Sequence, residues 1–347
     1  MSPLHTVAAY GPAAGSTRVR LLDWVRHLDL PAQHHGYRGG RDNALGGLAR
    51  DPLATLRAER SLHGLRLPGH RVLLSREASP LSTGAVEERL LRDAGRGTYD
   101  LDDALFHDDV GPRRLLGRPR RARRAAAAAD VVLAGNPYLA DWASQHARDV
   151  RVVPSCVEPG RYRPVTGWAV GDRPRLVWIG SPSTEAHLAT VGPALREVHR
   201  RTGAVTLVVS GAAPTAAMAP YEDVVERVPW TPEGFAAALA QGDVGLAPLP
   251  DTPWNRGKCA YKLLQYGATA LPVVGSPVGA NATALERLDG FAVDGVDDWV
   301  DALVVALTGS EQERARRGLA ARAAVEDHYS FAAWADRWRD AVLGGSA

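Results

Sequence analysis

Lysine is nearly absent from this sequence of 347 residues, where only Lys258 and Lys262 stand among 41 basic side chains. Cysteine is equally scarce, and two cysteines exclude a disulfide scaffold and a cysteine-based zinc site. No apolar run reaches the ~18–20 residues of a membrane-spanning helix, and no basic–apolar leader precedes the first strand-like segment. We therefore expect a cytoplasmic protein; contact with a membrane surface is an alternative that the composition does not favour.

Arginine is what the sequence has in quantity, and its distribution is uneven. Residues 1–165 carry 25 arginines against 18 acidic side chains, whereas residues 166–347 carry 16 basic and 21 acidic side chains. This asymmetry and the length predict two domains with different partners. One basic segment lacks interleaved aromatic residues and matches no nucleic-acid-binding motif, so we predict no nucleic-acid partner. We interpret the segment as a solvated helix face or loop. The alternative is that it contacts a phosphorylated or lipid-linked acceptor. Its members are Arg113, Arg114, Arg118, Arg120, Arg121, Arg123 and Arg124.

Short apolar runs alternate with helix-length segments along the whole chain. The runs show no polar–apolar alternation, which is typical of strands buried on both faces of a parallel sheet. Strands are predicted at His5–Tyr10, Val72–Ser75, Val131–Ala134, Val152–Pro154, Leu176–Gly180, Val205–Ser210, Val244–Ala247 and Pro272–Gly275. Helices are predicted at Val19–Leu28, Thr184–Arg201, Thr231–Ala240 and Asn281–Leu288, with two more between Glu311 and Leu343. The last of them, Ser330–Leu343, carries an apolar stripe that must pack on another surface, formed by Phe331, Trp334, Trp338 and Val342. This order predicts two doubly wound α/β domains joined by a Pro- and Gly-rich linker at 159–174.

Ligands of such sheets bind at the carboxyl ends of strands, so residues that follow strands are the candidates. Gly15, Ser16 and Arg18 follow the first predicted strand. A glycine-containing loop before a helix either binds an anion through backbone N–H groups or simply caps the helix, and the sequence does not separate these alternatives.

An acidic segment in the same half contains Asp102 and Asp103, with His107 close behind. The aspartates would hold a divalent metal, or orient a hydroxyl group in a cleft, or begin a helix. Because no other metal ligands lie nearby in the sequence, we expect no metal. His107 is interpreted as a polar histidine of the cleft or the surface.

Small residues follow two strands of the second half, in the arrangement that binds diphosphates through backbone N–H and hydroxyl groups at a helix N-terminus. The alternative is a plain strand-to-helix turn. Trp230, after another apparent strand, would either flank a nucleotide base or pack in the core. The small candidates are Gly180, Ser181, Ser183, Gly279 and Asn281.

The two lysines follow the predicted strand Val244–Ala247 and a Pro-rich loop. A helix is predicted to begin near Gly257, which would place Lys258, Lys262 and Tyr266 along one face. Two ammonium groups ~6 Å apart at a helix N-terminus would bind a diphosphate. The alternative is an exposed helix face with lysines by chance; the use of arginine everywhere else favours binding.

Together these segments resemble the donor domain of family-four retaining glycosyltransferases, the group 1 type of the GT-B fold. The segment Lys262–Val274, KLLQYGATALPVV, is similar to the family's "P-L-x-E-A-M-A-C-G-x-P-V-V". Similar pieces precede it at Asp130–Ala134 with Asn136, Arg151–Glu158, Trp178–Gly180 and Asp243–Pro248. In the first half, Glu77–Pro80 and Tyr99–Asp103 resemble a subgroup that carries "Asp-x-Asp-Asp".

The resemblance implies two facing Rossmann-like domains. Residues 1–165 would bind the acceptor, together with a last helix in 330–347 that crosses back to this domain, and residues 166–329 would bind the donor. The implied reaction moves a sugar from a nucleoside-diphosphate sugar to a small-molecule or glycan acceptor with retention, without metal or other cofactor. The implied site contains Lys258 and Lys262 at the diphosphate, Asp102, Asp103 and His107 at the reacting sugars, and Glu77 with Gly15, Ser16 and Arg18 in the acceptor domain.

The chain departs from the family at two positions where glutamates usually stand eight residues apart. Here they are Gly257 and Gln265. We expect Gln265 to bind ribose hydroxyls. Gly257 has no carboxylate to hold the donor sugar, and we expect Asp251 or Asn255 to take that role. The departures keep two alternatives open: a pseudoglycosyltransferase coupling enzyme and a non-catalytic accessory protein of the same fold. The composition suggests natural-product (antibiotic) biosynthesis as the setting, with envelope glycan synthesis as the alternative.

Overall fold

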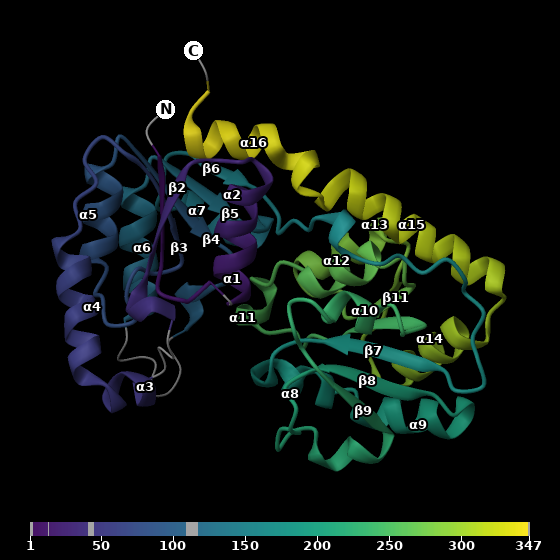
Figure 1. Cartoon of the computed structure of the whole chain (residues 1–347). Coiled ribbons are helices and arrows are strands. Elements are labelled where there is room, and N and C mark those ends of the chain that lie inside the picture. The colour runs from purple at the N-terminus through teal and green to yellow at the C-terminus, as the bar shows by residue number, and fades with distance from the viewer. Residues whose placement is uncertain (1–2, 13, 41–44, 109–116, 346–347) are drawn as a thin grey trace. The chain divides into compact units, whose positions relative to one another are not determined.

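The computed structural model describes residues 3–12, 14–40, 45–108 and 117–345, which form two compact units, each built on its own sheet (Figure 1). The first unit contains Met1–Ser155, Arg256–Cys259 and Trp334–Ala347, and the second contains Cys156–Asn255 and Ala260–Ala333. The predicted linker at 159–174 therefore lies within the second unit. No helix of the described residues is both long enough and apolar enough to cross a membrane.

The sheet of the first unit has six strands, all paired in parallel, in the order β2-β1-β3-β4-β5-β6. The chain leaves β1 for β2 on one side and then returns to β3 on the other, so the order reverses between β1 and β3. Open α/β sheets bind ligands at this kind of reversal. The strands are β1 (Leu4–Ala8), β2 (Ala32–Gly36), β3 (Arg71–Ser75), β4 (Arg96–Leu101), β5 (Val131–Ala134) and β6 (Val150–Val152).

Helices cover both faces of this sheet (Figure 1). The last helix of the chain, α16 (Phe331–Leu343), stacks its buried Trp338 on Trp24 at 5.1 Å between ring centroids. Arg96 also binds the carbonyl of Ala341 at 2.8 Å, which fixes this helix to the first unit as its predicted apolar stripe requires. The other helices are α1 (Gly15–Thr17), α2 (Asp23–His27), α3 (Leu45–Arg50), α4 (Pro52–Gly64), α5 (Ala85–Asp93), α6 (Arg118–Ala128) and α7 (Pro137–Ser144), with a π-helical turn at Arg18–Leu22.

The second unit repeats the design, with the strand order β12-β11-β10-β7-β8-β9, again all parallel. Its order reverses between β7 and β10. The strands are β7 (Arg175–Ile179), β8 (Val205–Ser210), β9 (Val225–Pro229), β10 (Val244–Ala247), β11 (Val273–Gly275) and β12 (Phe291–Ala292). The helices are α8 (Glu185–Ala189), α9 (Gly192–Thr202), α10 (Phe235–Leu239), α11 (Pro253–Arg256), α12 (Tyr261–Ala268), α13 (Ala280–Arg287), α14 (Val296–Thr308) and α15 (Glu311–Tyr329).

Strand β7 shows why its sequence has no polar alternation. Val177 and Ile179 belong to the apolar core on one face of the sheet, and Leu176 and Trp178 belong to the core on the other. Since each face is covered by helices, every position of the strand is apolar. The predicted α/β class is therefore confirmed.

All eight predicted strands are present, with end shifts of one or two residues in five of them. Strands β2, β4, β9 and β12 were not among these eight. Strands β2, β9 and β12 lie at sheet edges, and β4, although it is central, has the sequence RGTYDL without an apolar run. The predicted helix 184–201 is two helices, α8 and α9, since the chain turns before Gly192.

Candidate functional site

The carboxyl ends of β3 and β4 carry a network of charged side chains in the first unit. Arg76, directly after β3, donates from Nε and Nη2 to the two oxygens of Asp102 at 2.5 and 2.9 Å. The same Nη2 lies 2.5 Å from Asp103 Oδ2, and Lys258 Nζ lies 2.6 Å from Asp103 Oδ1. Both aspartates are buried, whereas Lys258 is 30% exposed. Two cations thus neutralise two carboxylates at the edge where a ligand would bind.

The electrostatics keep Asp102 ionised. Burial alone would raise the pKa of this carboxyl, but the charge and hydrogen bonds of Arg76, helped by Arg20 and Lys258, hold the pKa below its usual value. An ionised carboxylate only accepts hydrogen bonds. Asp102 is therefore suited to accept a hydrogen bond from a hydroxyl group of a ligand.

A second buried pair supports this network from behind. Arg20 donates to Asp100 Oδ1 from Nε at 3.0 Å and from Nη2 at 2.6 Å, and Ser75 Oγ donates to Oδ2 at 3.1 Å. Arg20 also donates to the carbonyl of Val153 at 2.9 Å. Because both charged side chains are at most 2% exposed, the pair fixes the end of β4 and contacts no solvent.

Glu77 is a structural centre of the first unit. Its carboxylate is 1% exposed and accepts hydrogen bonds from Tyr10 at 2.9 Å, from Arg118 at 3.2 Å and from Arg121. Burial, followed by the charge of Glu77, raises the pKa of Tyr10 to about 12, so the phenol stays a donor. The acceptor-binding role predicted for Glu77 thus stays a prediction, with its oxygens already engaged.

The same contacts correct the interpretation of the arginine-rich segment as a solvated face. Arg121 is 1% exposed because it is paired with Glu77, and Arg118 is paired with Glu77 and Asp108. Among the described arginines of this segment, only Arg120 and Arg123 are exposed. Arg113 and Arg114 lie outside the described residues.

The helix predicted to begin near Gly257 is wrong. Helix α11 ends at Arg256 and α12 begins only at Tyr261, after Ala260 in the left-handed region at φ 55°. The side-chain amide of Asn136, at the end of β5, donates to the carbonyls of Arg256 and Lys258 at 3.3 and 3.0 Å. These bonds hold two carbonyls at the end of α11, and the chain continues as a loop at 257–260, with Arg256–Cys259 packed in the first unit.

Lys258, Lys262 and Tyr266 consequently do not share a helix face. Lys258 binds Asp103, whereas Lys262 Nζ lies 5.4 Å from the centre of the Trp178 ring. Tyr266 is buried and donates from its hydroxyl to the carbonyl of Leu246 at 2.9 Å. The predicted pair of ammonium groups at one helix N-terminus is therefore wrong in its geometry.

Gly257 stands where no side chain fits. A Cβ there would lie 2.7 Å from the amide nitrogen of Ala104 and 2.6 Å from its Cβ. Beside it, Cys259 Sγ donates to the carbonyl of Asp102 at 3.4 Å, and burial raises the pKa of this thiol to about 12. The loop and the acidic segment thus touch so closely that this position excludes the family's glutamate.

The second unit has a different kind of carboxyl edge. The loops after β7, β10 and β11 are adjacent because the strands are. The N–H of Gly180 donates to Val209 at 3.1 Å, so it belongs to the sheet and is not available to a diphosphate. Ser181 and Ser183 are exposed, with hydroxyls 2.9 Å apart. Thr184, not Ser183, is the N-cap residue of α8, and no side chain caps this helix.

Two largely buried residues near this edge carry side-chain amides that have no hydrogen-bond partner among the described residues. Gln265 of α12 and Asn281 in the first turn of α13 are each 5% exposed. Within the described part of the chain, neither side-chain amide is hydrogen-bonded, although the backbone N–H of Asn281 donates to Val278 at 3.1 Å. Gly279, before α13, has φ 55°, which a side chain would strain. An amide group without a protein partner can donate and accept hydrogen bonds to a ligand.

The remaining residues predicted for the donor site have structural contacts. Asn255 is buried, and its side-chain amide donates to the carbonyl of Pro250 at 2.9 Å, so it holds its own loop. Asp251 is exposed in the same loop. Trp230 packs against the core, with its ring stacked on Phe235 at 6.2 Å.

The first loop and His107 lie in the first unit. Gly15 and Ser16 form the short helix α1 with Ala14 as the N-cap residue, and no side chain caps it. Arg18 is half-buried just after it. His107 Nε2 is hydrogen-bonded to the hydroxyl of Tyr138 at 2.7 Å. No set of three His, Cys, Asp or Glu side chains suitable for a metal occurs within the described ranges.

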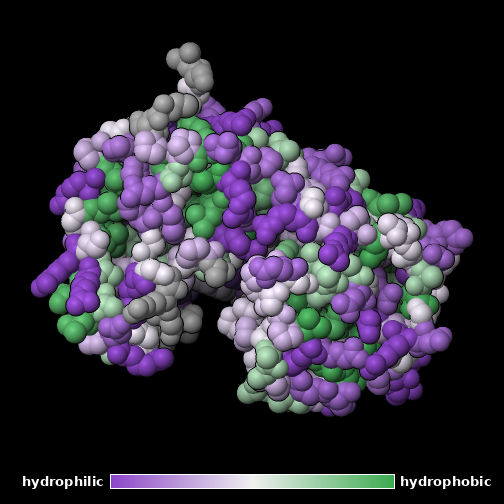
Figure 2. Space-filling model, in the orientation of Figure 1, coloured by the Kyte–Doolittle hydropathy of each residue, from purple (hydrophilic) through white to green (hydrophobic). Residues whose placement is uncertain are grey.

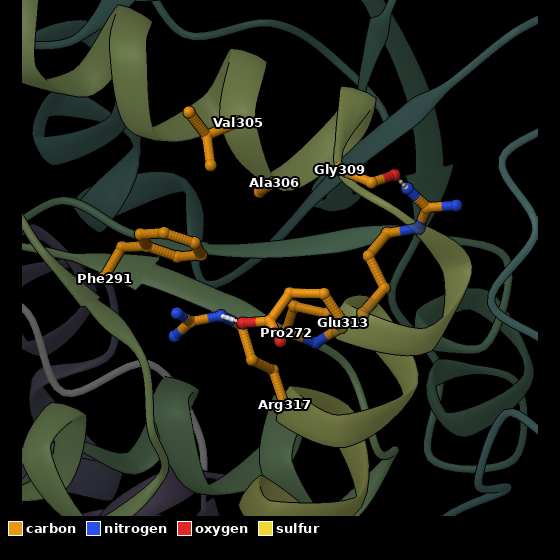
Figure 3. A pocket seen from close by; sticks show the side chains of 8 residues that line it. Pro272, Phe291, Val305, Ala306, Gly309, Glu313 and Arg317 are labelled. Atoms are coloured by element: carbon orange, nitrogen blue, oxygen red, sulfur yellow. Dashed lines mark hydrogen bonds and ion pairs between the residues drawn. The ribbon is translucent and has the colours of Figure 1, made fainter.

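A pocket of the second unit lies at the opposite end of its sheet. Pro272, directly before β11, lines it with Phe291 of β12 (Figure 3). Arg317 of α15 lies over the Phe291 ring at 4.2 Å and donates to Glu313 at 2.9 Å. No predicted site residue lines this pocket, so it is separate from the candidate site. Its other lining residues are Val305, Ala306, Gly309 and Arg314.

Sequence reasoning missed Arg76, Arg20 and Asn136. Arg76 directly follows the predicted strand Val72–Ser75, so the rule that selected the other loops would have selected it. Nothing in the local sequence indicates that Arg20 supports the site, because it lies in a helical segment and its partner Asp100 is 80 residues away. Asn136 was noted only as part of the family resemblance.

Solved structures show which class of fold this is. The chain is similar to an alpha,alpha-trehalose-phosphate synthase (UDP-forming) from Burkholderia vietnamiensis, at 13% identity and a TM-score of 0.66, over 99% of this chain and 100% of that one. It is also similar to WaaG, a glycosyltransferase involved in lipopolysaccharide biosynthesis, at 15% identity and a TM-score of 0.68, over 99% and 100% of the two chains. An E. coli structure with bound UDP-2-fluoro glucose matches at 12% identity and a TM-score of 0.69, over 99% and 100%. The fold is GT-B, with two Rossmann-like domains.

A family model identifies the second unit more closely. Residues 173–309, from β7 to α14, match the model described as "Glycosyl transferases group 1". The predicted resemblance to group 1 glycosyltransferases is thereby confirmed for residues 173–309. No curated protein matches the sequence.

Proposed function

We propose that this protein is a retaining glycosyltransferase that transfers a sugar from a nucleoside-diphosphate sugar to a small-molecule or glycan acceptor. The observation that carries the proposal is the carboxyl edge of the second unit. It combines the group 1 match with Lys262 and the unpaired side-chain amides of Gln265 and Asn281. The setting that we propose, cytoplasmic natural-product biosynthesis, rests on composition alone.

In the proposed donor site, the amides of Gln265 and Asn281 bind polar groups of the nucleotide sugar. Lys262 supplies the positive charge for the diphosphate, which gains negative charge as the sugar leaves. Backbone N–H groups at Ser181 and Gly279 are further donors. The neighbouring structures support this ligand class, since one was solved with UDP-2-fluoro glucose.

In the proposed acceptor site, Asp102 and Asp103 accept hydrogen bonds from acceptor hydroxyls. The ion pairs with Arg76 and Lys258 hold both carboxylates in place before the ligand arrives. Preorganised groups of this kind orient a reactant without a reorganisation cost. One neighbour, from Burkholderia xenovorans, was solved with glucose-6-phosphate, which makes sugar phosphates the first acceptors to test.

One observation favours a second candidate, the non-catalytic accessory protein. The family's first glutamate would stand at Gly257, where the contact with Ala104 leaves no space for a side chain. A protein that binds the donor without turnover would keep the edge of the second unit and lose this carboxylate.

The test is a panel of nucleotide sugars and acceptors, with released nucleoside diphosphate as the readout and calorimetry for binding. We expect turnover with at least one pair and its loss in Lys262→Ala, with partial rescue by Lys262→Arg. Arg120→Ala, an exposed cation of α6, is the control that should leave turnover unchanged. Binding without turnover throughout would establish the accessory role, and the absence of binding to every nucleotide sugar would contradict both candidates.

A further inference from the structure

Helix α4 of the first unit exposes large apolar side chains on one face. Leu53 is 65% exposed and Leu56 is 47% exposed. Among the described residues, no other helix or strand has two exposed large apolar side chains on one face, since Val296 and Val305 of α14 are nine positions apart on opposite sides. The others are Leu81, Val152 and Leu319.

The same face of α4 is basic. At 100° per residue, Leu53, Leu56, Arg57 and Arg60 lie within an arc of about 100°. Arg57 and Arg60 are exposed. The single acidic residue of the helix, Glu59, points away from this arc and accepts a hydrogen bond from Tyr37 at 2.7 Å. Figure 2 shows apolar side chains among hydrophilic ones at the surface over α4.

Positive charge continues around this face. Exposed arginines also stand at both ends of the helix, Arg50 at the end of α3 and Arg66 just beyond α4. Residues 1–165 as a whole carry 25 arginines against 18 acidic side chains. The surface therefore attracts an anionic partner.

The leucines decide which anionic partner fits best. A nucleic-acid backbone offers phosphates but no hydrocarbon for Leu53 and Leu56 at the same surface. The boundary of a lipid layer offers both, because an amphipathic helix there buries its apolar face about 5–10 Å into the headgroup/acyl boundary while its polar face stays beside the headgroups. Arginine reaches the phosphates while its apolar stem stays beside the leucines.

We propose that the face of α4 formed by Leu53, Leu56, Arg57 and Arg60 docks on an anionic lipid surface, with the helix lying in the plane of the interface. The leucines enter the acyl boundary, and the arginines bind lipid phosphates. This inference is independent of the proposed reaction, since it involves no residue of either candidate site.

The experiment is cosedimentation of the full-length protein with vesicles of phosphatidylcholine alone or with 30% phosphatidylglycerol. We expect binding to the anionic vesicles only, and its release by salt. Arg57→Gln with Arg60→Gln should weaken the affinity about 25-fold, at about fivefold per arginine. Leu53→Ser with Leu56→Ser should weaken it at least about tenfold.

Two matched variants control for charge and apolarity. Arg120→Gln with Arg123→Gln removes the same charge at the same spacing from the exposed face of α6, and Leu319→Ser removes an isolated exposed leucine of α15. Both should stay within about twofold of the parent. Hydrogen exchange should show vesicle-dependent protection at 53–60.

The proposal is overturned if the anionic vesicles do not bind, if neutral vesicles bind equally, or if the α6 variant loses as much affinity as the α4 variant. It is also overturned if the leucine variant keeps full affinity, since a purely basic face would then suffice, as for nucleic acid or an acidic protein.

Discussion

The carboxyl edges of the two sheets are opposite in character, although the sheets have the same design. The first unit fills its edge with charged side chains that satisfy one another, such as Arg76 with Asp102 and Lys258 with Asp103. At the edge of the second unit the polar groups are backbone groups, serine hydroxyls and the side-chain amides of Gln265 and Asn281, which have no hydrogen-bond partner among the described residues. The first edge is thus fixed by its own charges, whereas the second is completed by a ligand.

The substitution expected to change stability most, and so to test this comparison of the two edges most strongly, is at Arg20. Arg20→Met leaves the carboxylate of Asp100 buried without its cation, which should lower the free energy of unfolding by about 3–5 kcal/mol. Urea unfolding measures it, and Arg20→Met with Asp100→Asn should recover part of the loss. A loss below about 1 kcal/mol would show that the first edge does not depend on its ion pairs.

A smaller effect is expected at Gly257. In Gly257→Ala the new Cβ meets the backbone of Ala104, so the loop must shift, at a cost of about 1–3 kcal/mol. Gly160→Ala is the matched control, because the nearest atom to a Cβ at Gly160 is a Glu158 side-chain oxygen 3.9 Å away. Equal stability of the two variants in urea would mean that the loop does not need its close approach to Ala104.

The smallest effect is the pH dependence of the first unit. Burial lowers the pKa values of His5, His34 and His35, with neighbouring histidines adding to the shift at His5 and His35. The unfolded chain therefore binds more protons, and this contribution to stability is present above the ordinary histidine pKa of about 6.5 and is lost as the pH falls below it.

Unfolding in urea between pH 8 and pH 5 checks the sign. The free energy of unfolding should fall as the pH is lowered. In the His34→Gln variant it should fall less steeply than in the parent protein. The carboxyl groups with lowered pKa values, Asp102 among them, titrate below this window. A parent protein that gains stability toward pH 5 would contradict the assignment.

The sequence was sufficient for the strands that consist of an apolar run, because such a run, buried on both faces of the sheet, is recognisable by itself. Val205–Ser210 and Val244–Ala247 were predicted with the bounds that the structure has. Edge strand β2 was missed, since its polar sequence AQHHG carries no such pattern. The periodicity of α16 also predicted correctly that Trp338 is buried.

The site could be predicted only where its residues directly follow a strand in the sequence and their position does not depend on distant partners. The loops after β7 and β11 follow from the rule on carboxyl ends. The position of Lys258 does not, because it depends on Asn136 and Asp103, more than a hundred residues earlier in the chain. Arg121 was misjudged for the same reason, since its partner Glu77 is 44 residues away.

The two lysines test the central claim most directly, because each belongs to one edge. The measurement is calorimetric titration of UDP and UDP-sugars into Lys258→Ala and Lys262→Ala. The account predicts that Lys262→Ala weakens nucleotide binding by about tenfold or more, whereas Lys258→Ala stays within about twofold of the parent. An equal loss in both variants, or a loss in Lys258→Ala alone, would contradict the division of roles between the two edges.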